Sequence, residues 1–462
     1  MAQPKTMPTP LDPSEFPLMT GARLQMWEAL EQNDNYYELL LAINQHATVL
    51  EDSSRFISGT RPAGRIIRRD RSCRRRMAIL LCSIPRTLVG SVIRGTVAYD
   101  FLASNEPSPE HYSDTGAGTY VAGIAVRGRG GMFLNIEEIE KIVELLLRYC
   151  QCYDRYKAHG GSPVSASDKV DHAWARTVDH AWGRRPSKEP EKTRFIKSDH
   201  GYSSTKCLIK SFKSRCDPHR KDKRSAYIYQ KQSPLMVGCS NGLSERMPEH
   251  DPESSSRLGS TTPTWALLLC LIKVGLNLVP EVVVVPMIHI WEPDDLPASE
   301  VLGSALASSY CFQDGFNIIA GGGQQFTKDA DDPCLSASKK EVCHTNSFLL
   351  DNCAAVVREL NRRAQYVADA RTVAKFPEQE VFVNPMHELS LEAQKLKLDM
   401  YKLSDKCRQA GELRSELERI VDHEYEAVEI LGTTKKVLDL LLGRDDEPDV
   451  DDEEPIVEQI AI

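Results

Sequence analysis

The sequence predicts an α+β or mixed α/β protein: a helical N-terminal region, a small mixed sheet containing a βαβ unit, and a long, coiled-coil-like antiparallel helical hairpin at the C-terminus. Three patterns predict this class. Apolar residues recur at helical spacing over 20–105, β-branched runs lie between residues 119 and 320, and heptad repeats cover much of 344–443. The 462 residues are enough for more than one domain, each with its own core.

The first region, 20–105, follows a polar and proline-rich N-terminus (1–19) that we expect to be disordered. Apolar residues recur in this region at the three- and four-residue spacing of a buried helix face. Pro85 predicts the start of one helix, which the pattern continues to Leu102. The region is therefore predicted to be helical throughout, apart from an arginine-rich stretch.

A mixed α/β domain is predicted from two segments, 106–160 and 232–330. Residues 119–126 alternate larger and smaller side chains, as a strand does. The glycine turn at 128–131 and the short apolar run after it predict a hairpin. Asn135, with a glutamate three residues later, predicts the capped start of an amphipathic helix.

The βαβ unit is predicted in the second of these segments. A helix is expected over 263–276, and the β-branched run 281–291 is apolar on both faces, as a buried strand should be. A further helix over 297–310 and a strand over 316–320 complete the unit. Strand, helix and strand of this length fit a right-handed crossover between parallel strands.

Residues 161–231 are predicted to form a basic, poorly ordered insertion. Residues 184–231 contain fifteen Lys or Arg against five acids, and apolar periodicity is weak. An imperfect repeat, Val-Asp-His-Ala-Trp, occupies 170–174 and 178–182. Two copies are too few for a solenoid, so we interpret them as a duplicated turn of surface helix or linker.

The C-terminal region, 344–443, is predicted to be a pair of heptad helices, followed by an acidic tail at 444–462. The spacing keeps one apolar seam facing a partner helix, over about 65 Å in the second helix. The seam positions are Leu350, Cys353, Val357, Leu360, Ala364, Val367 and Arg371, and then Leu389, Ala393, Leu396, Met400, Leu403, Cys407, Ala410, Arg414, Leu417, Val421, Glu424, Val428 and Leu431.

The remaining composition favours a cytoplasmic or nuclear protein. No charged region leads into an apolar run at the N-terminus, as it would in a signal peptide. The most apolar stretch, 265–291, carries Lys273 and Glu281, so we interpret it as core and expect no membrane partner. Thirteen irregularly spaced cysteines indicate reduced thiols rather than a disulfide framework.

Ser240 is the candidate catalytic nucleophile. It is the central residue of Gly238–Gly242, Gly-Cys-Ser-Asn-Gly, which fits the G-x-S-x-G pattern of a nucleophile elbow. Such an elbow needs a strand before the serine and a helix after it, and two prolines weaken the helix here. The alternative is an ordinary loop after a strand.

An acidic crevice is the second candidate. Glu292, Asp294 and Asp295 follow the strand predicted at 281–291, and ligands of α/β sheets bind at the carboxyl ends of strands. These carboxylates could hold a hard cation such as magnesium, and Gly321, Gly322 and Gly323 could admit a phosphate. The alternative is that the aspartates cap the next helix and the glycines form a turn, so no cofactor is predicted.

Nucleic-acid binding or a nuclear-localisation role is the third candidate. Residues 61–76 contain eight arginines, whose guanidinium groups bind phosphates. The alternative is a solvated basic segment, because no fold signature of a nucleic-acid-binding protein accompanies it. The candidate arginines are Arg68, Arg69, Arg74, Arg75 and Arg76.

The pattern best developed along the chain is the heptad seam, and it favours an intracellular interaction or scaffold protein over an enzyme. The expected partner is another protein or a second copy of the chain, bound through 346–443. Two other classes stay open. One is an α/β enzyme using the acidic crevice for metal-assisted phosphate chemistry or Ser240 for hydrolysis, and the other is a nucleic-acid-binding protein.

Overall fold

The computed structural model describes residues 21–52, 71–103, 107–159, 165–182, 193–216, 225–254, 258, 261–319, 321–322, 332–373 and 395. The chain divides into two compact units, Met1–Gln365 and Tyr366–Ile462. All the elements described below belong to the first unit, except the last turns of α14, which belong to the second.

A three-stranded antiparallel sheet lies at the centre of the first unit, with strand order β2-β1-β3. Its strands are β1 (Gly118–Val126), β2 (Met236–Ser240) and β3 (Pro280–His289). Every residue of β1 is buried, because a strand flanks each edge and helices cover both faces. The strands predicted at 119–126 and 281–291 are confirmed, to within two residues at each end.

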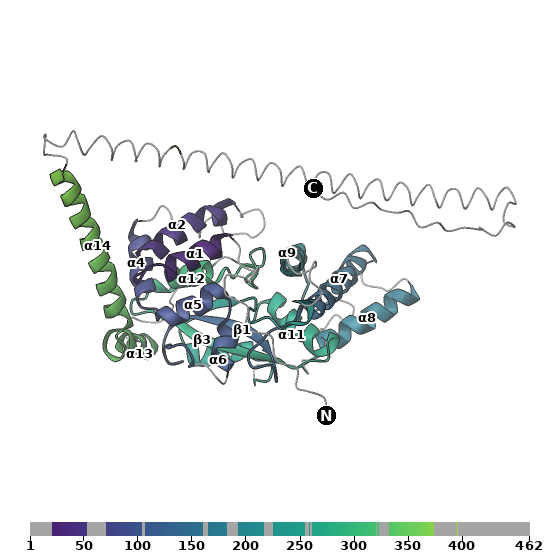
Figure 1. The fold of residues 1–462 in the computed structure, drawn as a ribbon. Helices are drawn as coiled ribbons and strands as arrows, with labels where there is room; N and C mark the ends of the chain where they lie inside the picture. The colour runs from purple at the N-terminus through teal and green to yellow at the C-terminus, as the bar shows by residue number, and fades with distance from the viewer. Residues whose placement is uncertain are drawn as a thin grey trace, which may run out of the picture. The chain divides into compact units, whose positions relative to one another are not determined.

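One face of the sheet is covered by the N-terminal helices and α12. Val121, Val237 and Val285 point to this side and share a core with these helices. In Figure 1, α1, α2, α4, α5 and α12 lie together on this side. The helices are α1 (Gly21–Glu31), α2 (Tyr37–Asp52), α4 (Arg71–Cys82), α5 (Arg86–Arg94), α6 (Val97–Leu102) and α12 (Asp295–Ala307).

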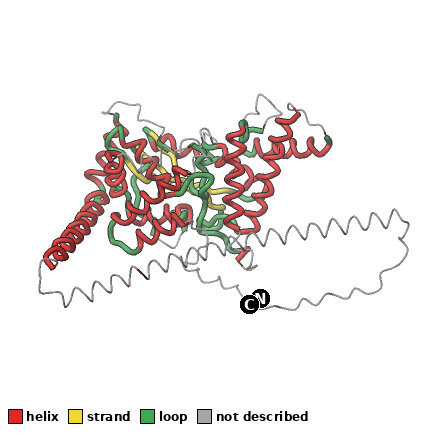
Figure 2. The backbone as a smooth tube through the Cα atoms, turned by 90° about the horizontal axis from the view of Figure 1, so that it is seen from above, coloured by secondary structure: helices red, strands yellow, loops and turns green. Residues whose placement is uncertain are grey.

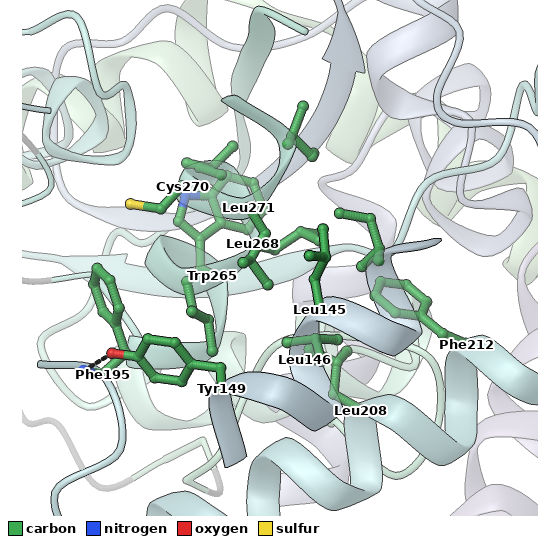
Figure 3. Packing of buried hydrophobic residues seen from close by; sticks show 14 of the residues in the cluster. Leu145, Leu146, Tyr149, Phe195, Leu208, Phe212, Trp265, Leu268, Cys270 and Leu271 are labelled. Atoms are coloured by element: carbon green, nitrogen blue, oxygen red, sulfur yellow. Dashed lines mark hydrogen bonds between the residues drawn. The ribbon is translucent and has the colours of Figure 1, made fainter. Parts of the chain in front are cut away.

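The opposite face packs against a second group of helices, so the strands lie between two helical layers (Figure 2). Ala122, Ile124 and Val284 alternate with the residues of the first face and point into this second core. Figure 3 shows Trp265 and Tyr149 inside it, with the Phe195 N–H donating to the Tyr149 hydroxyl at 3.1 Å. The helices are α7 (Ile136–His159), α8 (Ala166–Asp179), α9 (Asp199–Cys216) and α11 (Pro263–Gly275).

Short elements and one long helix complete the described chain. They are η4 (Ser225–Tyr227), α10 (Leu243–Arg246), η5 (Met247–His250), α13 (Pro333–Lys340), η6 (Glu341–Thr345, a single π-helical turn) and α14 (Phe348–Val373). The capped start predicted for α7 is confirmed. The Asn135 side chain accepts from the Glu138 N–H at 2.9 Å, and the Glu138 carboxylate accepts from the Asn135 N–H at 3.0 Å.

The predicted βαβ unit needs correction, because all the pairings in the sheet are antiparallel. The chain does return beside β2 after α12, but there it makes an isolated parallel bridge, Leu235 with Gly315, and no strand forms at 316–319, the described part of the predicted strand. The reason is Asn317. Its side-chain amide accepts from the Val237 N–H at 3.0 Å and donates to the Val237 carbonyl at 2.7 Å, so a side chain replaces the next backbone rung.

Two other predicted elements differ from the structure. The helix predicted from Pro85 to Leu102 is broken after α5 by Gly95, whose left-handed φ of 76° lets it terminate the helix. The run after the glycine turn does not form a hairpin strand. Its Phe133 N–H donates instead to Gln230 O at 2.7 Å.

The segment 161–231, for which we expected little order, contributes α8 and α9 to the second layer. The first copy of the tandem repeat lies within α8, and the second begins in its last turn and continues beyond it. A cation lies over the tryptophan of each copy. Arg148 lies 4.4 Å from the Trp174 ring centre and Lys273 lies 3.5 Å from that of Trp182. Charged neighbours therefore contribute to the packing of this segment, and apolar periodicity does not detect them.

No single described helix is long and apolar enough to cross a membrane. Residues Arg74–Cys82 and Arg86–Arg94 together have the length and composition of a span, but the two helices are bent by 109° relative to each other. The predicted C-terminal hairpin, 344–443, falls within the described residues as far as the end of α14, and its second helix lies outside them except for Lys395.

Candidate functional site

Ser240, the acids of the predicted crevice and Arg76 lie at one end of the sheet, where β2 and β3 end and β1 begins. Ser240 and His289 pair with Gly118 from opposite sides, so they occupy the same row of the sheet. α12 starts shortly after β3, at Asp295. Because β2 and β3 run in the same direction, two strand carboxyl ends and a helix N-terminus meet here.

Ser240 ends β2 and is followed by the short helix α10, so the strand and helix of an elbow are present. The geometry of the serine is nevertheless that of a local turn. Its hydroxyl donates to Gly242 O at 2.8 Å and accepts from the Gly242 N–H at 3.1 Å. In the described part of the chain no histidine contacts this hydroxyl, so the base that an elbow requires is not beside it.

The three acids of the predicted crevice do not converge on an open ligand site. Asp295 is buried, and its carboxylate pairs with Arg76 at 3.2 Å, while Asp294 lies 3.6 Å from the same guanidinium. Burial raises the pKa of Asp295, and Arg76 opposes that rise. Glu292 is exposed, and no group of metal-ligating side chains forms among the residues that the structure describes. Arg76 thus belongs to two candidate sites and neutralises the acidic one.

The predicted glycine turn lies against α12, but its backbone donors are already bound. The Gly322 N–H donates to the Glu300 carboxylate at 2.7 Å, and the Gly321 N–H to the Tyr310 hydroxyl at 3.4 Å. Gly322 has a left-handed φ of 87°, and a Cβ there would lie 2.8 Å from the Val301 side chain. These two glycines therefore allow the chain to pack closely against α12. Gly323 lies outside the described residues.

Two buried polar contacts that the sequence analysis missed lie near Ser240, one on each face of the sheet. The Cys239 thiol hydrogen-bonds the Glu300 carboxylate. The Tyr120 hydroxyl lies 2.7 Å from His250 Nε2 and also bonds Arg246. Strand alternation was the available signal, since it places Cys239 on the opposite face from Ser240.

The protonation states of these groups indicate that both contacts are structural. Burial raises the pKa of the Cys239 thiol and of the Glu300 carboxyl. Burial, with Arg246 nearby, lowers the pKa of His250 to about 3. The thiol is therefore protonated and the imidazole neutral at pH 7, and a protonated thiol is a poor nucleophile.

Of the candidate arginines, the described ones lie in α4. Arg74 and Arg75 are exposed, whereas Arg76 is half-buried and holds the aspartates at the start of α12. Arg68 and Arg69 lie outside the described residues. The phosphate-binding hypothesis therefore depends on two exposed guanidinium groups within the described part of the run.

The base of α14 is fixed to the first unit by polar contacts. The Asn352 side chain donates to Cys82 O at 2.9 Å and to Ile84 O at 3.1 Å, at the end of α4. Farther along, Arg363 pairs with Glu38 and lies 4.4 Å from the Tyr37 ring centre. Leu349 and Val356 also pack against the first core. One face of α14 therefore packs against the first unit.

A neighbouring face of α14 exposes apolar side chains at heptad spacing. Leu350 is 74% exposed, Val357 53% and Leu360 44%. We call these three residues the α14 stripe. They occupy three of the seam positions predicted from sequence, whereas the seam residue Cys353 turns toward the core. Side chains of this size are usually buried in a folded protein, so the α14 stripe is a candidate interface.

No protein-family model, no curated protein and no solved structure matches this chain. The α14 stripe therefore has to be interpreted from its own geometry.

Proposed function

We propose that this protein is a non-catalytic interaction or scaffold protein whose C-terminal heptad helices associate with those of a second copy. The observation that carries the proposal is the exposed α14 stripe, in phase with the heptad pattern of the sequence. An apolar stripe at this spacing gains free energy when a second helix covers it, at roughly 25 cal/mol per Å² of buried apolar surface.

The lengths of the two heptad segments favour a second copy over a purely internal hairpin. The 26 residues of α14 span about 39 Å at 1.5 Å per residue. A helix over 389–431 would carry its seam along about 65 Å. Folding back on α14 could thus cover only part of the second seam. The remainder needs another apolar helix, which a second copy of the chain supplies.

Light scattering during size-exclusion chromatography of the full-length chain tests this proposal. We expect the mass of a dimer or larger assembly for the unaltered chain. Leu350→Ser, Val357→Ser and Leu360→Ser together should shift the mass toward the monomer, because they remove exposed apolar surface from the α14 stripe.

A matched control replaces the next residue along the helix in each case, Asp351→Ser, Arg358→Ser and Asn361→Ser. These side chains are exposed but lie outside the stripe, so the assembly should persist. An unaltered chain that is monomeric at every concentration would refute the proposal. Equal loss of mass in both triple variants would show that the α14 stripe is not the contact.

A further inference from the structure

Helix α9 meets the segment after α12 through a row of polar residues at helical spacing. The Arg215 guanidinium binds both carboxylate oxygens of Asp314, at 2.6 and 2.5 Å, and the Ser211 hydroxyl donates to the same carboxylate at 3.0 Å. Arg215 and Asp314 are both buried. This ion pair fixes the register between α9 and the segment, so the contacts one and two turns earlier on the helix are also set.

Those earlier contacts bring two cysteines together. Cys207, on α9, hydrogen-bonds Cys311, and Ser204 also bonds the Cys311 thiol. Cys207 is half-buried, whereas Cys311 is fully buried. A small reagent can therefore approach one sulfur of the pair while the other is protected behind it.

The electrostatic environment distinguishes the two thiols. The hydrogen bond from Cys311, together with the charge of Lys210, lowers the pKa of Cys207 to about 7 against the effect of its burial. The hydrogen bond to Cys207 and burial raise the pKa of Cys311. Cys207 is thus the thiolate of the pair near neutral pH, and the thiolate is the reactive form of cysteine.

We propose that Cys207 and Cys311 form a reversible disulfide when the protein meets a hydroperoxide, with Cys207 as the attacking residue and Cys311 as the resolving one. The Cys207 thiolate attacks one peroxide oxygen of hydrogen peroxide and the O–O bond breaks. Cys207 becomes a sulfenic acid, and the leaving hydroxide takes a proton to give water. The Cys311 sulfur then attacks the Cys207 sulfur, and the sulfenic oxygen leaves as a second water with the Cys311 proton. Two thiols are oxidised by two electrons in total, and one peroxide is reduced.

The disulfide would join α9, in the second helical layer, to a segment with a strained backbone. Ser308 and Asp314 adopt positive φ angles of 46° and 106°, which non-glycine residues rarely do. The segment contacts the sheet through the isolated bridge at Gly315 and the side chain of Asn317. Oxidation would therefore replace a hydrogen bond by a covalent bond between the two layers.

The chain contains its own control in a second pair of neighbouring thiols. Cys82, at the end of α4, hydrogen-bonds Cys353 on α14. Burial and Cys353 raise the pKa of Cys82 to about 12. This pair is also in hydrogen-bond contact, but the pKa of Cys82 is raised, so Cys82 should react slowly. At pH 7.5 we expect Cys207 to be alkylated by iodoacetamide at least about tenfold faster than Cys82.

The test treats the full-length protein with hydrogen peroxide, blocks the remaining thiols and maps peptides by mass spectrometry without reduction. The expected product is a peptide pair joined through Cys207 and Cys311, which dithiothreitol separates. In Cys311→Ser, dimedone should label Cys207 as a sulfenic acid. In Cys207→Ser no sulfenic acid should form at Cys311. Cys82→Ser should leave the Cys207–Cys311 link unchanged.

Because the link is sought in the unaltered protein, the test does not depend on whether a variant folds. Failure of the Cys207–Cys311 link to form at peroxide concentrations that oxidise other cysteines would overturn the proposal. Preferential linking of Cys82 to Cys353 would overturn it as well, since proximity rather than the activated thiolate would then control the reaction.

Discussion

Asp314 is the buried anion on which two buried arginines depend. Besides the Arg215 contact, the Arg23 guanidinium lies 3.6 Å from this carboxylate and donates to Ile93 O at 2.8 Å. Burial lowers the pKa of Arg23 to about 10, so it stays charged at neutral pH. The three side chains come from α1, α9 and the segment after α12, and they join both helical layers at one point.

Asp314→Asn should destabilise the protein by roughly 3–5 kcal/mol, the usual effect of leaving a buried charge without its partner. Asparagine is similar in shape and tolerates positive φ better than most residues, so the change isolates the loss of charge. Chemical denaturation followed by circular dichroism measures the free energy of unfolding.

Glu140→Gln is the matched control for that experiment. It also neutralises a carboxylate, but on the exposed side of α7, and it should alter the free energy of unfolding by no more than about 0.5 kcal/mol. Equal effects of the two substitutions would contradict the role assigned to Asp314.

His289 makes the stability depend on pH. It is buried, it stacks on Tyr112 with ring centres 4.6 Å apart, and its Nε2 lies 3.1 Å from Ser113 O. Burial lowers its pKa from 6.5 to about 4, although Glu341 and the Ser113 carbonyl oppose that change. Between these pH values the unfolded chain binds the proton more readily than the folded one. The free energy of unfolding is therefore highest above pH 6.5 and falls as the pH drops toward 4, by about 3 kcal/mol at most from this residue.

His289→Phe should make the slope of the unfolding free energy against pH shallower between pH 6.5 and 4. The change should correspond to at most one proton bound on unfolding, because one titrating group is removed. The phenyl ring keeps the stacking on Tyr112 and removes the titrating group. His250 remains in both proteins, so the variant should retain part of the slope. Parallel pH profiles for the two proteins would contradict this assignment.

At the scale of the elements, α12 packs closely against the sheet at Gly303. A Cβ at this position would lie 3.1 Å from Thr119 Cγ2 and 3.2 Å from Val237 Cγ1. Gly303→Val should therefore overpack the contact and lower the free energy of unfolding by about 1–3 kcal/mol. Thermal and chemical denaturation measure the change.

Gly201→Val in α9 provides the comparison. The atoms nearest to a Cβ at Gly201 lie 3.8–3.9 Å away, an ordinary contact distance, and valine is a slightly better helix former than glycine. The variant should be as stable as the original protein or slightly more stable. A loss equal to that of Gly303→Val would contradict the account, because it would occur without a close contact between the new side chain and the sheet.

Elements with a strong local pattern could be predicted from the sequence, and those held by distant contacts could not. The capping pair at Asn135 and the run of valines in β3 each determine their element locally, and both predictions are confirmed. The return of the chain beside β2 was predicted as a strand because the side-chain role of Asn317 leaves no mark in the periodicity. The packing of α8 into the second layer was not predicted, because part of it comes from Arg148 over Trp174, a contact between distant parts of the chain.

The candidate site was less predictable than the fold. Sequence proximity brought Asp294 and Asp295 together as ligands, but Arg76, more than two hundred residues away in the chain, neutralises them. The serine at 240 was considered because of its neighbours in sequence, whereas the two buried contacts near it form between residues of β1, β2, α10, η5 and α12. Pairing of distant charges and thiols depends on tertiary structure, which one sequence does not display.

At the scale of the whole molecule, the first unit buries its core around the sheet but leaves the α14 stripe exposed. The acidic tail and the basic segments add strong charge segregation, since residues 445–458 alone hold nine acids in a chain of net charge −9. Charge of this kind affects solubility and the rate of association, whereas the apolar seam provides the contact itself.

The most direct test of this account is co-purification of two full-length chains that are expressed together with different affinity tags. The account predicts that each tag retrieves the other chain, and that Leu396→Ser, Leu403→Ser and Leu417→Ser in both chains abolish the retrieval. Retrieval of only the tagged chain itself, at concentrations well above those in the cell, would contradict association through the heptad helices.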